Sequence, residues 1–437
     1  MRRHSLVTVV IATLLCAGLV LSACQSTAAP SAPAPKVEEK AKAEAPAPAK
    51  PAEAKPAEAP KPAEAPKAEA KPAAKEPYKF GSVLSLSGPL AAVTVEARDA
   101  IVLELEAINA AGGVDGHQLQ VVFEDDGADA TRAATSFTKL IRQDNVLAVL
   151  GGQINVLEPS TRAITEREQV PQIILSATDP DTRAKKYKWS FNAAPNEMAS
   201  AAAIVDILRD KGYKKVAAIS ESVPSLQAIL NQVVSQAKAQ GIDVVVLSDT
   251  VGQKDVDVTP QVTKLKDLVN REKPQAVLTM LSLSAPVFLK SMKQLAIELP
   301  VVGGPSMANP QVVNVAGADA NGILVPAVKT LAAGKLPDSD PQKTAVVDFY
   351  KRYEAKYGKP PALSAGTADA TRMLAAALKV AGLNRGKIRD AIEKTTNYVG
   401  VGGIYTYSPD DHEGVSKSAF AVYEIKDKQF VYVRGIK

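Results

Sequence analysis

The segment from Gln25 to Glu76 consists almost entirely of Ala, Pro, Lys and Glu, and it limits what the chain can fold into more than any other feature. It contains imperfect repeats such as Lys55-Pro-Ala-Glu-Ala-Pro60 and Lys61-Pro-Ala-Glu-Ala-Pro66, no aromatic residue and a single valine. So little apolar surface cannot offset the entropy lost on folding, and frequent proline favours extended segments. We therefore predict a disordered linker over residues 24–76, with all folded structure after it.

The sequence before this linker has the pattern of an export signal. Arg2 and Arg3 precede an apolar run, Leu6 to Leu21, that is too short and wrongly flanked for a transmembrane helix. The run ends in Leu21-Ser22-Ala23-Cys24, which resembles the lipobox of bacterial lipoproteins. This resemblance implies a signal peptide over 1–23 and an acylated Cys24 that anchors the protein to a membrane on its extracytoplasmic side, in the periplasm or at the cell surface. The alternative is a plain secretory signal that is cut near the same place.

Composition excludes several kinds of chemistry in the exported part. The two cysteines are Cys16, inside the signal, and Cys24, so the folded part is held together without disulfides. The formal net charge is +5, but Lys and Arg alternate with Asp and Glu along the chain. Such interleaving gives no single-sign surface for nucleic acid. We expect no nucleic-acid partner, and we expect a monomer.

After Tyr78, short apolar runs alternate with amphipathic helical stretches. Continuous apolar strands joined by helices are typical of parallel sheets that are covered on both faces. The series starts twice along the chain, which predicts an α/β fold of two doubly wound parallel-sheet lobes. The expected strands are 83–84, 119–123, 146–150 and 172–175, then 216–219, 244–247, 276–280 and 301–302, with short strands near 403–407 and 419–425 at the end.

In open α/β sheets, ligands bind beyond the carboxyl ends of the strands. The segments that follow the predicted strands contain Ser, Thr, Asn, Gln, Gly, Pro and aliphatic residues, with very few ionisable groups. These segments are 85–93, 151–157, 176–182, 220–226, 281–286 and 303–309. They offer hydrogen bonds and shape rather than reactive groups.

Neither histidine of the exported part, His117 or His412, follows a strand, so a Ser-His-Asp set or a zinc site is not expected. The acidic groups at 125–126, 179–181 and 410–411 have the sequence context of turn and cap residues. The glycine pairs 112–113 and 151–152 lack the motifs that hold nucleotide phosphates. We therefore expect a ligand-binding protein that is not an enzyme and has no cofactor and no metal.

Several stretches after Tyr78 form a recognisable series. They are Phe80-Gly-Ser-Val-Leu-Ser-Leu-Ser-Gly-Pro-Leu-Ala-Ala92, Glu96-Ala-Arg-Asp99, Ile108-Asn-Ala-Ala-Gly-Gly-Val-Asp-Gly116, Phe123-Glu-Asp-Asp126, Pro171-Gln-Ile-Ile-Leu-Ser-Ala-Thr178, Phe191-Asn-Ala-Ala-Pro195, Val301-Val-Gly-Gly304, Gly322-Ile-Leu-Val325 and Tyr357-Gly-Lys-Pro-Pro361. In this order they resemble the branched-chain amino-acid-binding (Leu/Ile/Val-binding) proteins, which are type I periplasmic binding proteins of ABC importers. The resemblance covers essentially everything after Tyr78.

The resemblance implies two lobes that are joined by three crossovers and close on a ligand. We expect crossovers near 191–196, 325–328 and 403–407. Lobe one would comprise 77–194 and 327–405, and lobe two 195–326 and 406–437. The membrane partners would be the permease subunits of an ABC importer, which recognise the closed form.

Transferring the family's binding loops to this chain gives a set of candidate ligand-binding residues. Thr178 can donate through its hydroxyl and its amide, which suits a carboxylate or an amide oxygen. Asn155 stands where the family usually has serine, so a polar group is retained there. The complete set is Ser87, Val93, Gly152, Gln153, Asn155, Ser176, Ala177, Thr178, Glu221, Pro224, Leu283, Pro305 and Ser306.

The chain departs from the family where the ligand's ammonium would bind. Amino-acid-binding members have an acidic residue after the Gly-Gly strand end, where this chain has Pro305-Ser306. A cleft tyrosine is replaced around Pro224, and an aromatic residue by Val93. A buried ammonium without a partner carboxylate is costly to desolvate. Glu221 could supply that carboxylate, or it could be a solvent-facing helix cap.

We therefore expect a small, mostly uncharged or monoanionic ligand with an apolar body rather than a standard amino acid. The leading hypothesis is a solute-binding lipoprotein of an ABC importer. One alternative is a sensor that signals to a partner after it binds its ligand. Another is an envelope lipoprotein that has lost its ligand.

Overall fold

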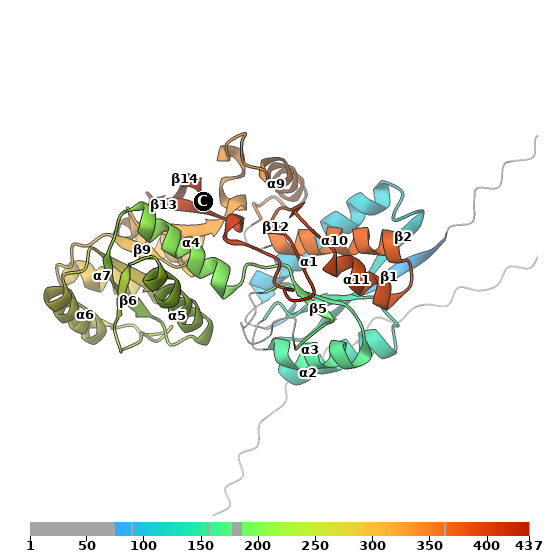
Figure 1. The fold of residues 1–437 in the computed structure, drawn as a ribbon, viewed down its shortest axis with the longest axis horizontal. Helices are drawn as coiled ribbons and strands as arrows, with labels where there is room; N and C mark the ends of the chain where they lie inside the picture. Colours follow the sequence, from blue (N-terminus) through green and yellow to red (C-terminus); the bar gives the residue numbers. More distant parts are fainter. Residues whose placement is uncertain (1–74, 89–90, 155–156, 177–185, 362–363, 437) are drawn as a thin grey trace, which may run out of the picture. The chain divides into compact units, whose positions relative to one another are not determined.

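Two β-sheets organise the part of the chain that the computed structural model describes (Figure 1). The described residues are 75–88, 91–154, 157–176, 186–361 and 364–436, and all of them belong to the compact unit Ala70–Lys437. The predicted signal peptide, the lipidation site at Cys24 and the predicted linker up to residue 74 lie outside them. The predicted end of the linker at residue 76 is wrong, because Lys75 and Glu76 begin the first strand, β1 (Lys75–Leu84), where Lys75 pairs with His117. No helix in these described ranges combines the length and apolarity needed to cross a membrane.

Lobe one is built on a five-stranded parallel sheet with the order β2-β1-β3-β4-β5. Residues of α1, α10 and α11 pack on one face of this sheet, and residues of α2 and α3 form a separate cluster on the other. The strands are β1 (Lys75–Leu84), β2 (His117–Asp125), β3 (Val149–Gly151), β4 (Gln172–Ile174) and β5 (Ser190–Asn192). The helices are α1 (Ala91–Ala110), α2 (Ala130–Arg142), α3 (Glu158–Glu168), α9 (Lys343–Tyr357), α10 (Ala365–Ala381) and α11 (Arg385–Glu393).

Lobe two is built on a seven-stranded sheet with the order β14-β13-β10-β9-β8-β6-β7. The strands from β10 to β7 are parallel, and β13 and β14 add antiparallel strands at one edge. The strands are β6 (Lys215–Ser220), β7 (Asp243–Val246), β8 (Ala276–Met280), β9 (Val301–Gly303), β10 (Leu324–Val328), β13 (Phe420–Lys426) and β14 (Gln429–Gly435). The helices are α4 (Glu197–Asp210), α5 (Pro224–Ala239), α6 (Thr259–Glu272), α7 (Ala285–Gln294) and α8 (Pro310–Ala316).

The sheets form where the apolar runs predict them, because both faces of each sheet are buried. Residues of α4 and α5 cover one face of the lobe-two sheet, and residues of α6, α7 and α8 cover the other. The apolar residues of α5, spaced to lie on one face of the helix, are all buried: Leu226, Ile229, Leu230, Val233 and Ala237. The α/β fold of two doubly wound lobes is therefore confirmed.

The chain passes between the two lobes three times. It leaves lobe one after β5, returns after β10, and leaves again after the small hairpin of β11 (Tyr398–Val399) and β12 (Ile404–Tyr405). The first and third connections are hydrogen-bonded to each other: Asn192 N donates to His412 O at 2.9 Å, and Tyr407 donates its hydroxyl to Asn192 O at 2.8 Å. The lobe boundaries expected from the resemblance stay predictions.

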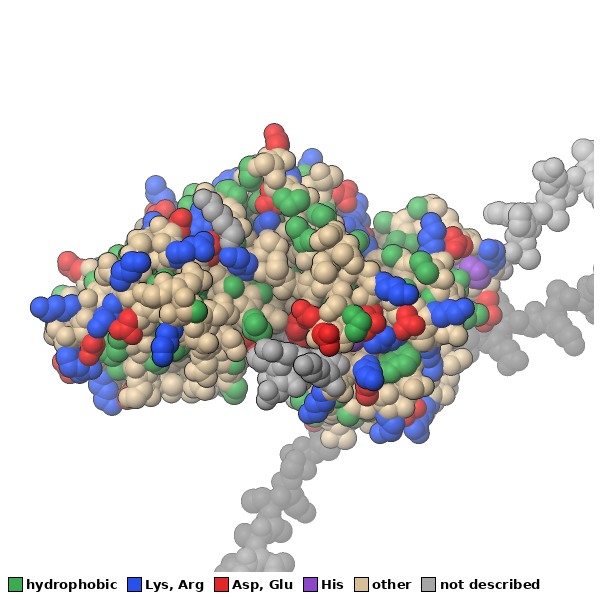
Figure 2. Space-filling view, in the orientation of Figure 1, with side chains coloured by type: hydrophobic (Ala, Val, Ile, Leu, Met, Phe, Trp, Pro, Cys, Tyr) green, Lys and Arg blue, Asp and Glu red, His purple; other side chains and the backbone are tan. Residues whose placement is uncertain are grey.

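Positive and negative side chains lie among one another over much of the described face in Figure 2, as their interleaving in the sequence predicts.

Lobe one also contains a buried ionic network. Glu104 of α1 is nearly completely buried and accepts from Arg352 of α9 at 2.7 Å. It also accepts from Arg372 of α10, at 2.7 Å from Nε and 3.0 Å from Nη2. One carboxylate therefore ties the C-terminal helices to α1.

Glu104→Ala is expected to lower the free energy of unfolding by about 3 kcal/mol, because it leaves two partly buried guanidinium groups without their shared partner. Glu106→Ala on the same helix is the matched control. Glu106 is largely exposed and pairs with Lys356, so its loss should cost less than about 1 kcal/mol. Urea denaturation followed by circular dichroism measures both, and equal losses would contradict the network's role.

Candidate ligand-binding site

Neighbouring parallel strands end at the same edge of a sheet, so the loops after them are brought together. In lobe one, β1, β3 and β4 are adjacent and are followed by segments 85–88, 152–154 and 175–176. In lobe two, β6, β8 and β9 are adjacent and are followed by 221–223, 281–284 and 304–307. These two groups of strand ends contain the predicted residues Ser87, Gly152, Gln153 and Ser176, and Glu221, Leu283, Pro305 and Ser306.

Four predicted residues cannot be placed. Asn155, Ala177 and Thr178 lie outside the described residues, as does the side chain of Val93. Pro224 is described and is the exposed first residue of α5.

The loop after β1 is shaped by two aspartates. Asp126 accepts from the Ser85 hydroxyl at 2.5 Å and from Ala128 N at 2.9 Å. Asp125 accepts from Ser87 N at 3.2 Å and from Gly127 N at 2.9 Å. Both carboxylates are therefore engaged by a turn, which confirms their interpretation as turn residues. Ser87 itself is exposed, and its side chain is presented at the surface.

The loops after β3 and β4 meet at the Ser176 hydroxyl. Ser176 Oγ lies 2.8 Å from Gly152 O and is also in hydrogen-bond contact with Glu158, the first residue of α3. Gly152 has a φ of 79°, a conformation that favours glycine, and this brings its carbonyl under Ser176. Within the described residues, Gln153 Oε1 is buried and has no hydrogen-bond partner. An unpaired buried amide oxygen is costly, so a ligand donor at this position would be favourable.

Glu158 was not predicted from the sequence, although its pKa is strongly shifted. Its side chain is 1% exposed, and its carboxyl lies 3.3 Å from Nη2 of Arg162, which is also buried. Burial raises the pKa of Glu158 to about 8, against the opposing effects of Arg162 and Ser176. Glu and Arg four residues apart on a helix usually indicate an exposed surface pair, so no local pattern points to this buried position.

The strand ends of lobe two are organised by Glu221. Its side chain is fully buried, so the alternative of a solvent-facing cap is wrong. Its carboxylate accepts four hydrogen bonds from the loop after β8. Two come from Ser282, at 2.8 Å from N and 2.6 Å from Oγ, and two come from Ser284, at 2.9 Å and 2.5 Å. All of these donors belong to lobe two itself.

This anchoring leaves one apolar side chain exposed at the strand ends. Leu283 lies between the two anchored serines and is 53% exposed, while both residues beside it contact Glu221. Ser306, in the short turn Pro305–Met307, donates its hydroxyl to Leu281 O at 2.8 Å. The lobe-two edge therefore presents an apolar side chain, and among its described residues Glu221 is the only carboxylate.

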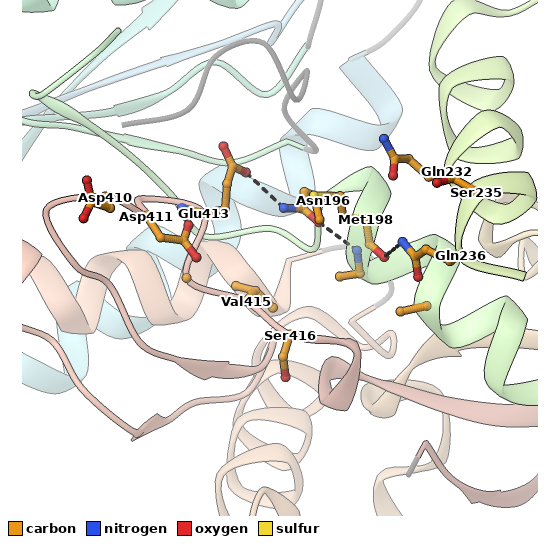
Figure 3. Close-up of a pocket in the computed structure, with 13 residues that line it drawn as sticks. Asn196, Met198, Gln232, Ser235, Gln236, Asp410, Asp411, Glu413, Val415 and Ser416 are labelled. Atoms are coloured by element: carbon orange, nitrogen blue, oxygen red, sulfur yellow. Dashed lines mark hydrogen bonds between the residues drawn. The ribbon is translucent and has the colours of Figure 1, made fainter. Parts of the chain in front are cut away.

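A hollow of about 690 Å³ lies elsewhere, beside the first and third connections (Figure 3). Asn196 of this hollow donates to Glu413 at 3.4 Å, and Gln236 donates to Met198 O at 3.2 Å. It is lined by residues of α4, α5 and 410–416, and none of the predicted binding residues lies in it. Ligands of parallel sheets bind at strand ends, so we assign the site to the strand ends and not to this hollow.

The histidines have structural contacts. His412 is buried against Phe191 and lies 3.0 Å from both Ser190 O and Glu393. His117 stacks on Tyr78. No group of His, Cys, Asp and Glu in the described ranges could hold a metal ion.

Glu221→Ala is expected to destabilise the protein by about 3 kcal/mol, because it leaves several buried donors of the 282–284 loop without an acceptor. The amides of Ser282 and Ser284 should then exchange faster with deuterium, which mass spectrometry of that segment would detect. Glu298→Ala, at an exposed position of the same lobe, is the control. Unchanged exchange in the Glu221 variant would show that the carboxylate does not hold this loop.

Glu158 should make stability depend on pH. Its pKa is raised from 4.5 to about 8, so the folded protein keeps a proton that the unfolded chain has already released. The free energy of unfolding should fall as pH rises from about 4.5 to about 8, and this contribution should be constant above that range. Glu158→Gln removes the titrating group, so its stability should vary less across this window. Urea denaturation at several pH values tests this, and identical profiles for both proteins would contradict it.

Comparisons with known proteins identify relatives of this chain. A curated relative from Pseudomonas aeruginosa, a leucine-, isoleucine-, valine-, threonine- and alanine-binding protein, is 25% identical over 348 residues, which cover 78% of this chain and 87% of the relative. A chemotactic signal transduction system substrate-binding protein from Halobacterium salinarum is 32% identical over 149 residues, 32% of this chain and 35% of its own length.

The fold is that of solved binding proteins. The substrate-binding protein LivJ of a branched-chain amino acid transporter from Streptococcus pneumoniae, solved with isoleucine, superposes with a TM-score of 0.67 at 24% identity, over 82% of this chain and 99% of LivJ. The family model described as "Periplasmic binding protein" matches residues 77–429. The chain therefore belongs to the periplasmic binding protein family.

Proposed function

We propose that this protein is an extracytoplasmic solute-binding lipoprotein that delivers a small ligand to an ABC importer by closure of its two lobes. Family membership supports the binding role, and the relatives named above include binding proteins for amino acids. Closure follows if the ligand contacts the strand ends of both lobes, because only the closed form then gains both sets of contacts. The described strand ends carry hydrogen-bonding and apolar groups, which suits binding without chemistry.

The ligand that these groups favour has an oxygen-bearing head and an apolar body. Lobe one offers the hydroxyl of Ser87 at its strand ends, and Asn155 and Thr178 are predicted to add donors. The unpaired Oε1 of Gln153 is an acceptor, which suits the N–H of an amide head. Lobe two offers the exposed side chain of Leu283. Small apolar carboxylates, their amides and amino-acid-like molecules without a free ammonium fit this set.

The observation that carries the proposed ligand class is that the Glu221 carboxylate is already hydrogen-bonded within the protein. Its carboxylate is fully buried and already accepts four hydrogen bonds from Ser282 and Ser284. A ligand ammonium would have to compete for this acid with donors that are already in place. Desolvation of a ligand ammonium that has no carboxylate partner costs several kcal/mol of binding free energy. This cost lowers the affinity for the ligand roughly a hundredfold or more.

Three ligands that differ only at one end test this directly: leucine, 4-methylpentanoate, which lacks the ammonium, and 4-methylpentanamide, which lacks both charges. We expect 4-methylpentanoate or its amide to raise the melting temperature more than leucine at equal concentration. Strong stabilisation by leucine, isoleucine or valine would refute the proposed ligand class while leaving a binding role intact.

Leu283→Ala is expected to weaken 4-methylpentanoate binding about tenfold, because burying a leucine side chain contributes roughly 1.5 kcal/mol or more. Isothermal titration calorimetry measures the change. Val315→Ala removes an even more exposed aliphatic side chain from α8 of the same lobe and should leave the affinity unchanged. An unchanged affinity in the Leu283 variant would exclude this side chain from the site.

Lipidation of Cys24 is tested by Cys24→Ala in the native host. We expect the wild-type protein in the membrane fraction and the variant released as a soluble protein, because several acyl chains are needed for stable anchoring. Incorporation of a labelled fatty acid into the wild type alone would support the anchor. Release of both proteins would instead favour a plain secretory signal.

A sensor role is the second candidate, and the similarity to the Halobacterium salinarum chemotaxis protein favours it. The two roles differ in what ligand-dependent closure does. A deletion strain that no longer takes up the ligand supports transport, whereas intact uptake with loss of a ligand-dependent response supports sensing. A binding-deficient structural lipoprotein would show no ligand-dependent change in small-angle scattering.

A further inference from the structure

The Ser176 hydroxyl lies between two oxygen atoms of lobe one. One is the carbonyl oxygen of Gly152, at 2.8 Å, and the other is Oε1 of Glu158. A serine hydroxyl has a single proton, so it donates fully to one oxygen only. The carbonyl of Gly152 can only accept. When Ser176 donates to Gly152, the hydrogen bond to Glu158 needs a proton that Glu158 itself supplies.

The second oxygen of Glu158 fits this assignment. Oε2 lies 3.3 Å from Nη2 of Arg162, which can only donate. A carboxylic acid with its proton on Oε1 and its free lone pairs on Oε2 therefore satisfies both neighbours. The resulting chain runs from Glu158 to Ser176 to Gly152, and it joins the loops after β3 and β4.

The surroundings of Glu158 favour the uncharged form. Glu158 is 1% exposed. Burial is the largest effect and raises the pKa of Glu158 to about 8, and Glu413 in the third connection and Glu197 at the start of α4 act in the same direction. Arg162, on α3 itself, and the hydrogen bond with Ser176 act in the opposite direction but do not offset burial.

We propose that Glu158 is a positioning residue that works as an uncharged carboxylic acid: it fixes Ser176 against Gly152 and keeps a negative charge away from the lobe-one strand ends. This inference rests on the proposed function for its consequence in binding. An ionised Glu158 would repel an anionic ligand head across a poorly screened interior. Binding of a carboxylate should therefore require that Glu158 keeps its proton.

Infrared difference spectroscopy of the full chain tests the protonation without any ligand. The wild-type minus Glu158→Gln spectrum at about pH 7 should contain the C=O stretching band of a protonated carboxyl, and this band should disappear as pH rises through about 8. Glu298→Gln, at an exposed position, should give carboxylate bands instead at the same pH. Carboxylate bands from Glu158 at pH 7 would overturn the proposal in favour of an ion pair with Arg162.

Calorimetry with 4-methylpentanoate, which stays ionised throughout the range, tests the consequence. The dissociation constant of the wild type should rise about fivefold between about pH 8 and about pH 9, and it should be flat in Glu158→Gln. The Glu298→Gln control should follow the wild type. A flat wild-type profile would overturn the link to binding. If the probe binds at no pH, the proposed ligand class fails, and the infrared result still decides the state of Glu158.

Discussion

Parallel strand pairing is the constraint on which this molecule depends. Each pair of parallel strands must be joined by a crossover, usually a helix, so helices cover both sheet faces and the loops collect at the carboxyl ends. In lobe one this brings together the loops after β1, β3 and β4, and in lobe two those after β6, β8 and β9. The residues of the candidate site are far apart in the sequence, and the strand order of the two sheets brings their loops together.

Buried carboxyl groups then shape these loops. Glu221 holds the loop after β8 by four hydrogen bonds, Asp126 holds the loop after β1, and Glu158 joins the loops after β3 and β4. Asp369 plays the same part beside the β11–β12 hairpin, where it accepts from Val401 N at 2.8 Å and Gly402 N at 2.6 Å. Charged side chains cost much to bury, so Glu221, Asp126 and Asp369 each accept hydrogen bonds that compensate for the lost water.

Sequence periodicity predicted the two lobes and most strands, because a strand buried on both faces needs a continuous apolar run. Four strands, β5, β10, β11 and β14, escaped it, and for two of them the physical reason is evident. β10 contains Pro326, which normally argues against a strand inside a sheet, and β5 is only Ser190–Asn192, with a single apolar residue. The position of the strand-end loops was predictable, but the state of their acids was not. Glu221 is fixed by two serines some sixty positions later, and no local pattern contains that information.

The pairing of the first and third connections has a mechanical consequence. Asn192 bonds to both His412 and Tyr407, and Asn192 and Asn196 both donate to Glu413, so neither connection can bend without the other. A joint of two coupled chains admits fewer relative orientations of the lobes than two independent tethers would. Less orientational entropy is then lost when a solute is captured, so preorganisation of the backbone contributes to affinity before any contact with the solute is made.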